Sequence, residues 1–125
     1  MKKIIHTDNA PKAIGTYSQA VLADKFLFIS GQIGLDPSTM ELVVGFEEET
    51  IQVLKNISSI CEEADCSIND VIKFNVLLTD LSNFQKVNEI MESALEKPYP
   101  ARAAYEVSSL PKNSSIEIES IAYKQ

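Results

Sequence analysis

The sequence contains few of the residues that most catalytic motifs require. It has one histidine, His6, and no H-E-x-x-H, G-x-x-x-x-G-K-[ST] or G-x-G-x-x-G motif. A Ser-His-Asp or Cys-His triad needs a histidine that a third group orients, and His6 has no evident partner. We therefore expect neither a triad, nor a metal site, nor a nucleotide cradle of the familiar kinds. Any catalysis must use carboxylates, hydroxyls, arginine and backbone amides.

Long apolar runs and clusters of positive charge are also missing. No stretch approaches the ~20 apolar residues that span a bilayer, and no secretory cleavage pattern follows the N-terminal lysines. The eleven basic residues are scattered, and the formal net charge is −7. Because phosphate neutralisation dominates binding to nucleic acid and to anionic membranes, we expect neither as a partner. We expect a cytoplasmic protein.

Cysteine is scarce as well. Cys61 and Cys66 stand in "ICEEADC", without a second pair or a histidine cluster. On a helix that runs through both positions their side chains would not face each other. We therefore expect two small buried or half-buried side chains rather than a disulfide or metal ligands.

The length of 125 residues suits one domain, residues 1–125, with one core. Apolar residues recur at helical spacing in 46–64 and 82–96, where Ser82 and Gln85 form a capping-box pattern and Pro98 follows. Period-two alternation or short apolar runs predict strands at 2–7, 16–24, 25–33, 70–80, 102–109 and 115–123. In the strand at 70–80 we expect Ile72, Phe74, Val76 and Leu78 on one face.

The predicted order is therefore β-β-β-α-β-α-β-β. Two helices cannot cover both sides of such a sheet, so we expect an α+β sandwich with both helices on one face of a mixed sheet. The last strand carries apolar residues on both faces, including Ile118 on one and Ile121 on the other. An apolar sheet face without helices predicts that another subunit covers it, and hence a homo-oligomer.

Arg102 is the first candidate for a functional residue. It stands between alanines in "PYPARAAYEV", with only Glu106 near enough in sequence to pair with it. A guanidinium can bind a substrate carboxylate through two parallel hydrogen bonds, and small neighbours leave room for it. The alternative is a surface arginine whose aliphatic stem covers the edge of the sheet.

Glu117 is the second candidate, between isoleucines in "SIEIES". Alternation places it on the face opposite to Ile116 and Ile118. If that face is buried against a neighbour, a desolvated carboxylate there could act as a base or orient a water. The alternatives are a solvent-facing glutamate or an interface salt bridge.

Three further positions stand out. Asn88 lies on the apolar stripe of the second helix, where a buried amide either bonds to backbone groups or touches a ligand. Tyr17 follows Gly15 and either closes over a site or packs. Ser30 and Gly31 end a strand, where glycine lets the backbone approach a ligand closely.

Four segments together resemble the RidA/YjgF family of reactive-intermediate deaminases, whose members were once named as endoribonucleases. They are "APKAIGTYSQAV", "FISGQIGLDPSTMEL", "FNVLLTDLSNFQKVNEIMES" and "YPARAAYEVSSLPKNSSIEIESIA". The resemblance covers essentially the whole chain. It implies a chorismate-mutase-like fold, a homotrimer with sites between subunits, and no cofactor.

The resemblance also implies an activity. Family members hydrolyse short-lived enamines and imines, such as 2-aminoacrylate/2-iminopropanoate and 2-iminobutanoate, to 2-keto acids and ammonia. Position by position, Arg102 matches the substrate-carboxylate arginine and Glu117 the glutamate beside the attacking water. Tyr17 and Asn88 match pocket residues, and Ser30 and Gly31 match the strand-end pair beside the ligand.

Two positions depart from the family's pattern. Ala104 stands where the family often has cysteine; its backbone N–H can still meet the substrate carboxylate, but any role of a thiol is lost. Thr16 replaces a common proline before Tyr17, which leaves the loop less constrained.

Two other functions stay open from the sequence. A regulatory protein that binds a small carboxylate, such as a 2-keto acid or an amino acid, would also need Arg102 but would not need Glu117 for turnover. A ribonuclease agrees poorly with the net charge of −7 and the single histidine.

Overall fold

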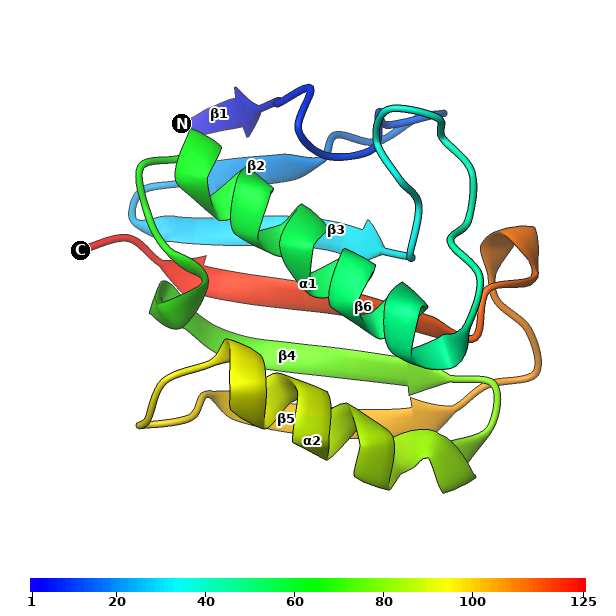
Figure 1. Cartoon of the computed structure of the whole chain (residues 1–125). Coiled ribbons are helices and arrows are strands. Elements are labelled where there is room, and N and C mark those ends of the chain that lie inside the picture. The colour runs from blue at the N-terminus through cyan, green and yellow to red at the C-terminus, as the bar shows by residue number, and fades with distance from the viewer.

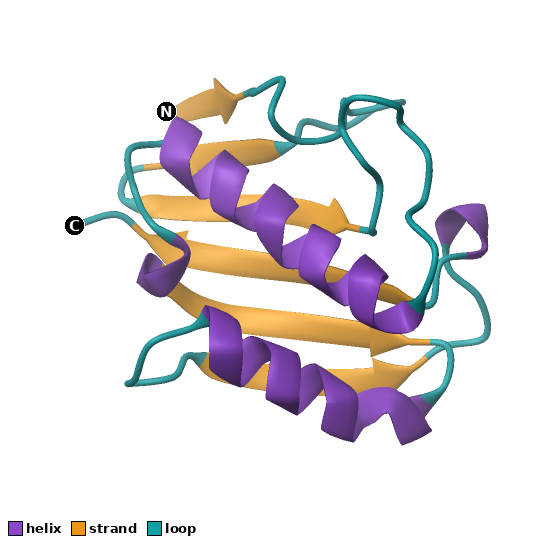
Figure 2. Cartoon of the chain, in the orientation of Figure 1, coloured by secondary structure: helices purple, strands orange, loops and turns teal.

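Two helices cover one face of a six-stranded sheet in the computed structural model, which describes residues 1–125 (Figure 1). The helices are α1 (Phe46–Glu63) and α2 (Phe84–Ala94). The strands are β1 (Lys2–Ile5), β2 (Ala20–Ala23), β3 (Phe26–Gln32), β4 (Val71–Leu78), β5 (Ala101–Glu106) and β6 (Ile116–Tyr123). The predicted α+β class, with both helices on one face, is confirmed (Figure 2).

The strand order in the sheet is β1-β2-β3-β6-β4-β5. All neighbouring strands are antiparallel except β4 and β5, so the sheet is mixed, as predicted. A parallel pair needs a crossover connection, and α2 provides it. This crossover places α2 over the edge strand β5, which carries Arg102.

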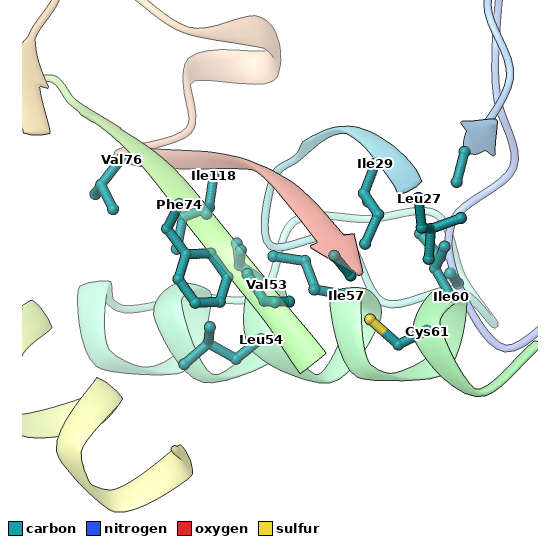
Figure 3. Close-up of a cluster of buried hydrophobic side chains, with 14 of the residues drawn as sticks. Leu27, Ile29, Val53, Leu54, Ile57, Ile60, Cys61, Phe74, Val76 and Ile118 are labelled. Carbon is teal, nitrogen blue, oxygen red and sulfur yellow. The ribbon is translucent and has the colours of Figure 1, made fainter. Parts of the chain in front are cut away.

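The core lies between the sheet and the helices (Figure 3). Phe74 and Val76 of β4 and Ile118 of β6 are fully buried and point towards α1. Val53 and Ile57 meet them from the apolar stripe of α1, also fully buried. Burial of such side chains stabilises the fold by about 1.5–3 kcal/mol each. Because the residues of this stripe repeat at helical spacing, they all lie on the one face of the helix that packs against the sheet.

Both helices are shorter than predicted. The segment before α2 is a 3-10 turn, Leu81–Asn83, and the side chain of Asp80 accepts a hydrogen bond from the Ser82 backbone N–H at 3.0 Å. The predicted capping box of Ser82 and Gln85 is therefore wrong, because Asp80 caps the turn instead. The residue before α2, Asn83, makes no side-chain cap.

One predicted face assignment fails at the start of β4. The pairing of β4 with β6 is irregular between Val71 and Lys73. Val71 is 5% exposed, whereas Ile72, which we expected beside Phe74, is 44% exposed. An extra residue in one strand reverses the side-chain alternation at that point.

The face of the sheet opposite the helices has no cover within the chain. Ile4, Phe28 and Ile121 stand in one row across β1, β3 and β6. The ring of Phe26 lies 5.1 Å from that of Tyr123 on the same face, measured between centroids. These five residues form what we call the open-face patch, and it agrees with the apolar second face that the sequence predicted.

None of the helices has the length and apolarity that crossing a membrane requires.

Candidate functional site

Arg102 projects from β5 towards α2. Its guanidinium carbon lies 4.8 Å from the ring centroid of Phe84, and its Nη1 lies 4.0 Å from the sulfur of Met91. A cation over an aromatic face is held by the ring quadrupole, and a thioether is only a weak acceptor. The chain's three ion pairs do not include Arg102. The guanidinium is therefore positioned by α2 but keeps its strong hydrogen-bonding capacity free.

Glu106, the one acidic residue near Arg102 in sequence, has another partner. Its carboxylate accepts a hydrogen bond from the Leu81 backbone N–H at 2.9 Å. This contact ties the end of β5 to the turn before α2, so Glu106 does not neutralise Arg102.

Arg102 lines a cavity of about 360 Å³ between α2 and the start of β5. We call it the Arg102 pocket, and its lining residues are Phe74, Asn88, Met91, Glu92, Leu95, Tyr99, Pro100 and Arg102. Asn88 is half-buried on α2, and its side-chain amide makes no hydrogen bond within the chain, so this amide is free to bind a ligand. Arg102 and Asn88 were expected here from the sequence. Glu92 and Tyr99 were not, because their place in the lining depends on how α2 packs on β5.

Glu117 projects from the other face of the sheet. Its neighbours Ile116 and Ile118 are fully buried on the helix side, and Glu117 is half-buried on the opposite side. The carboxylate lies directly against Gly31: a Cβ at position 31 would come within 2.8 Å of the carboxyl carbon. The β3–β6 pairing is irregular between Ile29 and Gln32, so Gly31 lies in a bulge opposite this part of β6.

The environment of Glu117 favours its protonated form. Burial raises the pKa of the Glu117 carboxyl above its ordinary value, and the negative charge of Glu119 raises it further. A carboxylate with a raised pKa can accept a proton more readily, which suits a general base.

Glu117, Gly31 and Tyr17 line a second cavity of about 280 Å³, which we call the Glu117 pocket. Tyr17 is half exposed, and its hydroxyl accepts a hydrogen bond from the Ile14 backbone N–H at 3.3 Å. This bond holds the ring at the mouth of the pocket while leaving the hydroxyl proton free to donate. The structure therefore brings three of the predicted site residues, Tyr17, Gly31 and Glu117, together in one cavity.

Gln19 also lines the Glu117 pocket, which the sequence did not predict. Its side chain is 2% exposed and makes four hydrogen bonds, to the N–H and carbonyl of Thr7 and to the carbonyls of Ala10 and Pro11. These bonds fasten the segment between β1 and β2 to the pocket wall. A glutamine before an apolar strand carries no sequence signal for this role.

Two predicted residues lie in neither cavity lining. The hydroxyl of Ser30 donates to the Ser18 carbonyl at 2.6 Å and so links β3 to the segment before β2. Ala104 is half-buried on β5 and packs against the core. Both neighbour pocket residues, but their side chains serve the fold here.

The two cavities lie on opposite faces of the sheet. Arg102 faces α2, whereas Glu117 faces away from the helices. No residue lines both cavities. Within one chain, the predicted carboxylate-binding residue and the predicted base therefore do not meet.

The cysteines take no part in either pocket. Cys61 is buried, Cys66 is half-buried, and both are free thiols. Burial raises the pKa of both thiols, and the Cys66 sulfur donates to the Cys61 carbonyl. No cluster of three or more His, Cys, Asp or Glu residues could hold a metal ion.

The fold and these pockets define a small α+β protein that offers small molecules a free guanidinium and a half-buried carboxylate. The chain belongs to the RidA/YjgF family: the family model described as Endoribonuclease L-PSP matches residues 7–124.

Individual relatives agree with this assignment over nearly the whole chain. A RutC family protein of Pyrococcus horikoshii is 54% identical over 126 residues, covering all of both chains. The human 2-iminobutanoate/2-iminopropanoate deaminase is 50% identical over 123 residues, 98% of this chain and 90% of the human one. The crystal structure of RidA from the Antarctic bacterium Psychrobacter is 56% identical, with a TM-score of 0.95 over 97% of this chain and 98% of that chain.

Proposed function

We propose that this protein hydrolyses 2-imino acids and their enamine tautomers to 2-keto acids and ammonia, without a cofactor. The proposed substrates include 2-iminobutanoate and 2-aminoacrylate/2-iminopropanoate. The observation that carries the proposal is the unpaired guanidinium of Arg102 at a cavity, since all these substrates bear a carboxylate next to the reacting carbon. The human relative, 50% identical, is named as a deaminase of two of them.

We further propose that the site forms between two copies of the chain. The Arg102 pocket and the Glu117 pocket face opposite ways, so one copy would supply the guanidinium and the next the carboxylate. The open-face patch offers a surface on which copies can associate, because apolar sheet faces of this kind are usually covered. We propose a closed ring of three copies. In this ring the Arg102 pocket of each copy lies against the Glu117 pocket of a neighbour, so that every site contains both residues.

The proposed reaction needs only one acid–base group. Arg102 binds the carboxylate and orients the imine carbon, with the free amide of Asn88 as a second contact. Ionised Glu117 removes a proton from a water molecule as its oxygen bonds to that carbon and the C=N electrons move to nitrogen. The carboxyl then returns this proton to the nitrogen, which gives a carbinolamine. Ionised Glu117 next takes the proton of the new hydroxyl and passes it to the nitrogen, and the C–N bond breaks so that ammonia leaves as the carbonyl forms. Positioning and one proton-transfer group commonly contribute several powers of ten.

The first test measures turnover. A serine or threonine dehydratase generates the imine in the cuvette, and keto-acid release is followed with and without the protein. We expect acceleration by the wild type and a background rate with Glu117→Ala. A wild type that binds pyruvate but leaves the rate at background would instead favour the regulatory carboxylate-binding protein.

The second test addresses the shared site. Arg102→Met and Glu117→Gln, each of which we expect to be inactive alone, are unfolded and refolded together in equal amounts. In a three-membered ring each mixed assembly regains one native site, so random mixing restores roughly a quarter of the wild-type rate. Absence of recovery would mean that each chain builds its site alone. Light scattering checks the assembly, which should weigh three times the 13.8 kDa of one chain.

A further inference from the structure

The Arg102 pocket contains charges of both signs. Glu92 lines it together with Arg102, and neither residue belongs to the chain's three ion pairs. A pocket that bound only a small carboxylate would gain nothing from a second carboxylate, which repels the ligand. The ligand that suits both groups carries a negative charge and a positive charge.

The helix places Glu92 beyond the carboxylate-binding end of the pocket. Asn88 and Glu92 are four residues apart on α2, so their side chains are neighbours on one face. Arg102 contacts α2 through Phe84 and Met91. Glu92 therefore lies towards the C-terminal end of α2, with Leu95 one turn further as an apolar wall.

The nearest cation in sequence does not neutralise Glu92. The ammonium of Lys97 is held over the ring of Tyr99, 6.0 Å from its centroid. The cavity, at about 360 Å³, also exceeds what a three- or four-carbon acid fills. The pocket thus has room for a longer side chain and an unpaired carboxylate along its wall.

We propose that Glu92 selects 2-imino acids whose side chain carries a cation, with the carboxylate on Arg102, the methylene groups against Leu95 and the cationic group on Glu92. This inference rests on the proposed imine hydrolysis for its substrate class. Its binding component, a preference for a cationic tail on a carboxylate ligand, does not depend on turnover.

The binding test uses two matched compounds, 5-guanidinopentanoate and 5-ureidopentanoate, which have the same length and shape but differ in charge. Their dissociation constants are measured by NMR titration against wild type, Glu92→Gln and Glu89→Gln. Glu89 is the matched control, because it lies on α2 outside the pocket and next to Lys86, 3.9 Å away. We expect the guanidino compound to be favoured about threefold to fivefold in wild type and Glu89→Gln, as for a partly exposed ion pair, and this preference to vanish in Glu92→Gln.

A preference that survives in Glu92→Gln overturns the proposal, as does failure of the wild type to bind either compound. The turnover arm compares imines produced by an amino acid oxidase from arginine and from citrulline, with 2-iminobutanoate as reference. Glu92→Gln should lower kcat/KM for the arginine-derived imine alone. If the wild type hydrolyses no imine, the proposed function is wrong. The dissociation constants of the two matched compounds still show whether Glu92 favours a cationic ligand.

Discussion

The carboxylate of Glu117 occupies the space that a side chain at Gly31 would need. A Cβ at Gly31 would come within 2.8 Å of the Glu117 carboxyl carbon and closer still to Oε2. Gly31 does not have a positive φ, so its backbone suits any residue. The glycine is therefore required by the position of Glu117 rather than by the turn of the chain.

Gly31→Ala should displace the Glu117 carboxylate while leaving the fold intact. A misplacement of about 1 Å commonly costs ~100-fold in rate, so we expect a loss of that order in kcat/KM. A double-mutant cycle with Glu117→Ala locates the cause. Gly31→Ala should lower the free energy of unfolding when Glu117 is present and change it little in the Glu117→Ala variant. An equal decrease in both proteins would show that the two residues are not coupled.

The raised pKa of Glu117 predicts the pH dependence of activity. If the ionised carboxyl accepts the proton of water, kcat/KM should rise with pH and reach half its maximum above 4.5, the ordinary value for glutamate. Glu119→Gln removes the neighbouring charge that raises this pKa, so the acid limb should move to lower pH. Glu89→Gln, which lies outside the linings of both pockets, should leave the acid limb in place. An acid limb that does not move in Glu119→Gln would contradict the assignment of the limb to Glu117.

The same shift predicts how stability depends on pH. A raised pKa means that the folded chain binds the Glu117 proton more tightly than the unfolded chain does. The stabilisation is therefore complete below pH 4.5 and is lost as pH rises through the raised pKa. Glu117→Gln should melt above wild type at pH 7 and show no such gain at pH 4, at equal protein concentration. An equal gain at both pH values would exclude ionisation as its cause.

The fold was predictable where side-chain periodicity decides which face is buried. Val53 and Ile57 repeat at helical spacing, and Ile116 and Ile118 alternate with Glu117, so each element's inner face follows from the sequence. The exception is Ile72, whose exposure depends on an extra residue in the pairing of β4 with β6. A bulge is a property of two paired strands, and neither strand encodes it alone.

The candidate site was predictable only in part, because contacts between elements, like the bulge, do not follow from the sequence of either element alone. Arg102 stood out because a lone guanidinium among small residues has no local partner. Its actual contacts, Phe84 and Met91, depend on the way the crossover lays α2 over β5. Glu92 gains its role from that same packing. Gln19 gains its role from the path of the segment between β1 and β2, whose backbone it binds. Single-residue patterns carry no information about either arrangement.

Gln19→Leu should destabilise the chain through lost hydrogen bonds rather than lost volume. Leucine fills similar space but leaves the Thr7 N–H and the carbonyls of Thr7, Ala10 and Pro11 without their buried partner. We expect the free energy of unfolding to fall by about 3 kcal/mol. Denaturant titration checks this, with the exposed Gln85→Leu on α2 as the matched control. A loss no larger than that of Gln85→Leu would show that water replaces the bonds at little cost.

Arg102→Lys separates the charge of the guanidinium from its geometry. Lysine keeps the positive charge but cannot donate two parallel hydrogen bonds to one carboxylate. Loss of a charge-assisted hydrogen bond costs about 1.5–3 kcal/mol, so KM for 2-iminobutanoate should rise roughly 10- to 100-fold. Because the carboxylate is bound equally before and during the attack of water, kcat should change far less.

Lys97→Met is the control for this prediction. It removes a positive charge near the same pocket, but the ammonium of Lys97 lies over the ring of Tyr99 and not beside the guanidinium of Arg102. It should leave KM within about twofold of wild type, as for other exposed charges. If Arg102→Lys leaves KM near the wild-type value while Lys97→Met raises it, the pocket senses only its total charge. The paired hydrogen bonds of Arg102, which give the proposed site its orientation of substrate, would then have no part in binding.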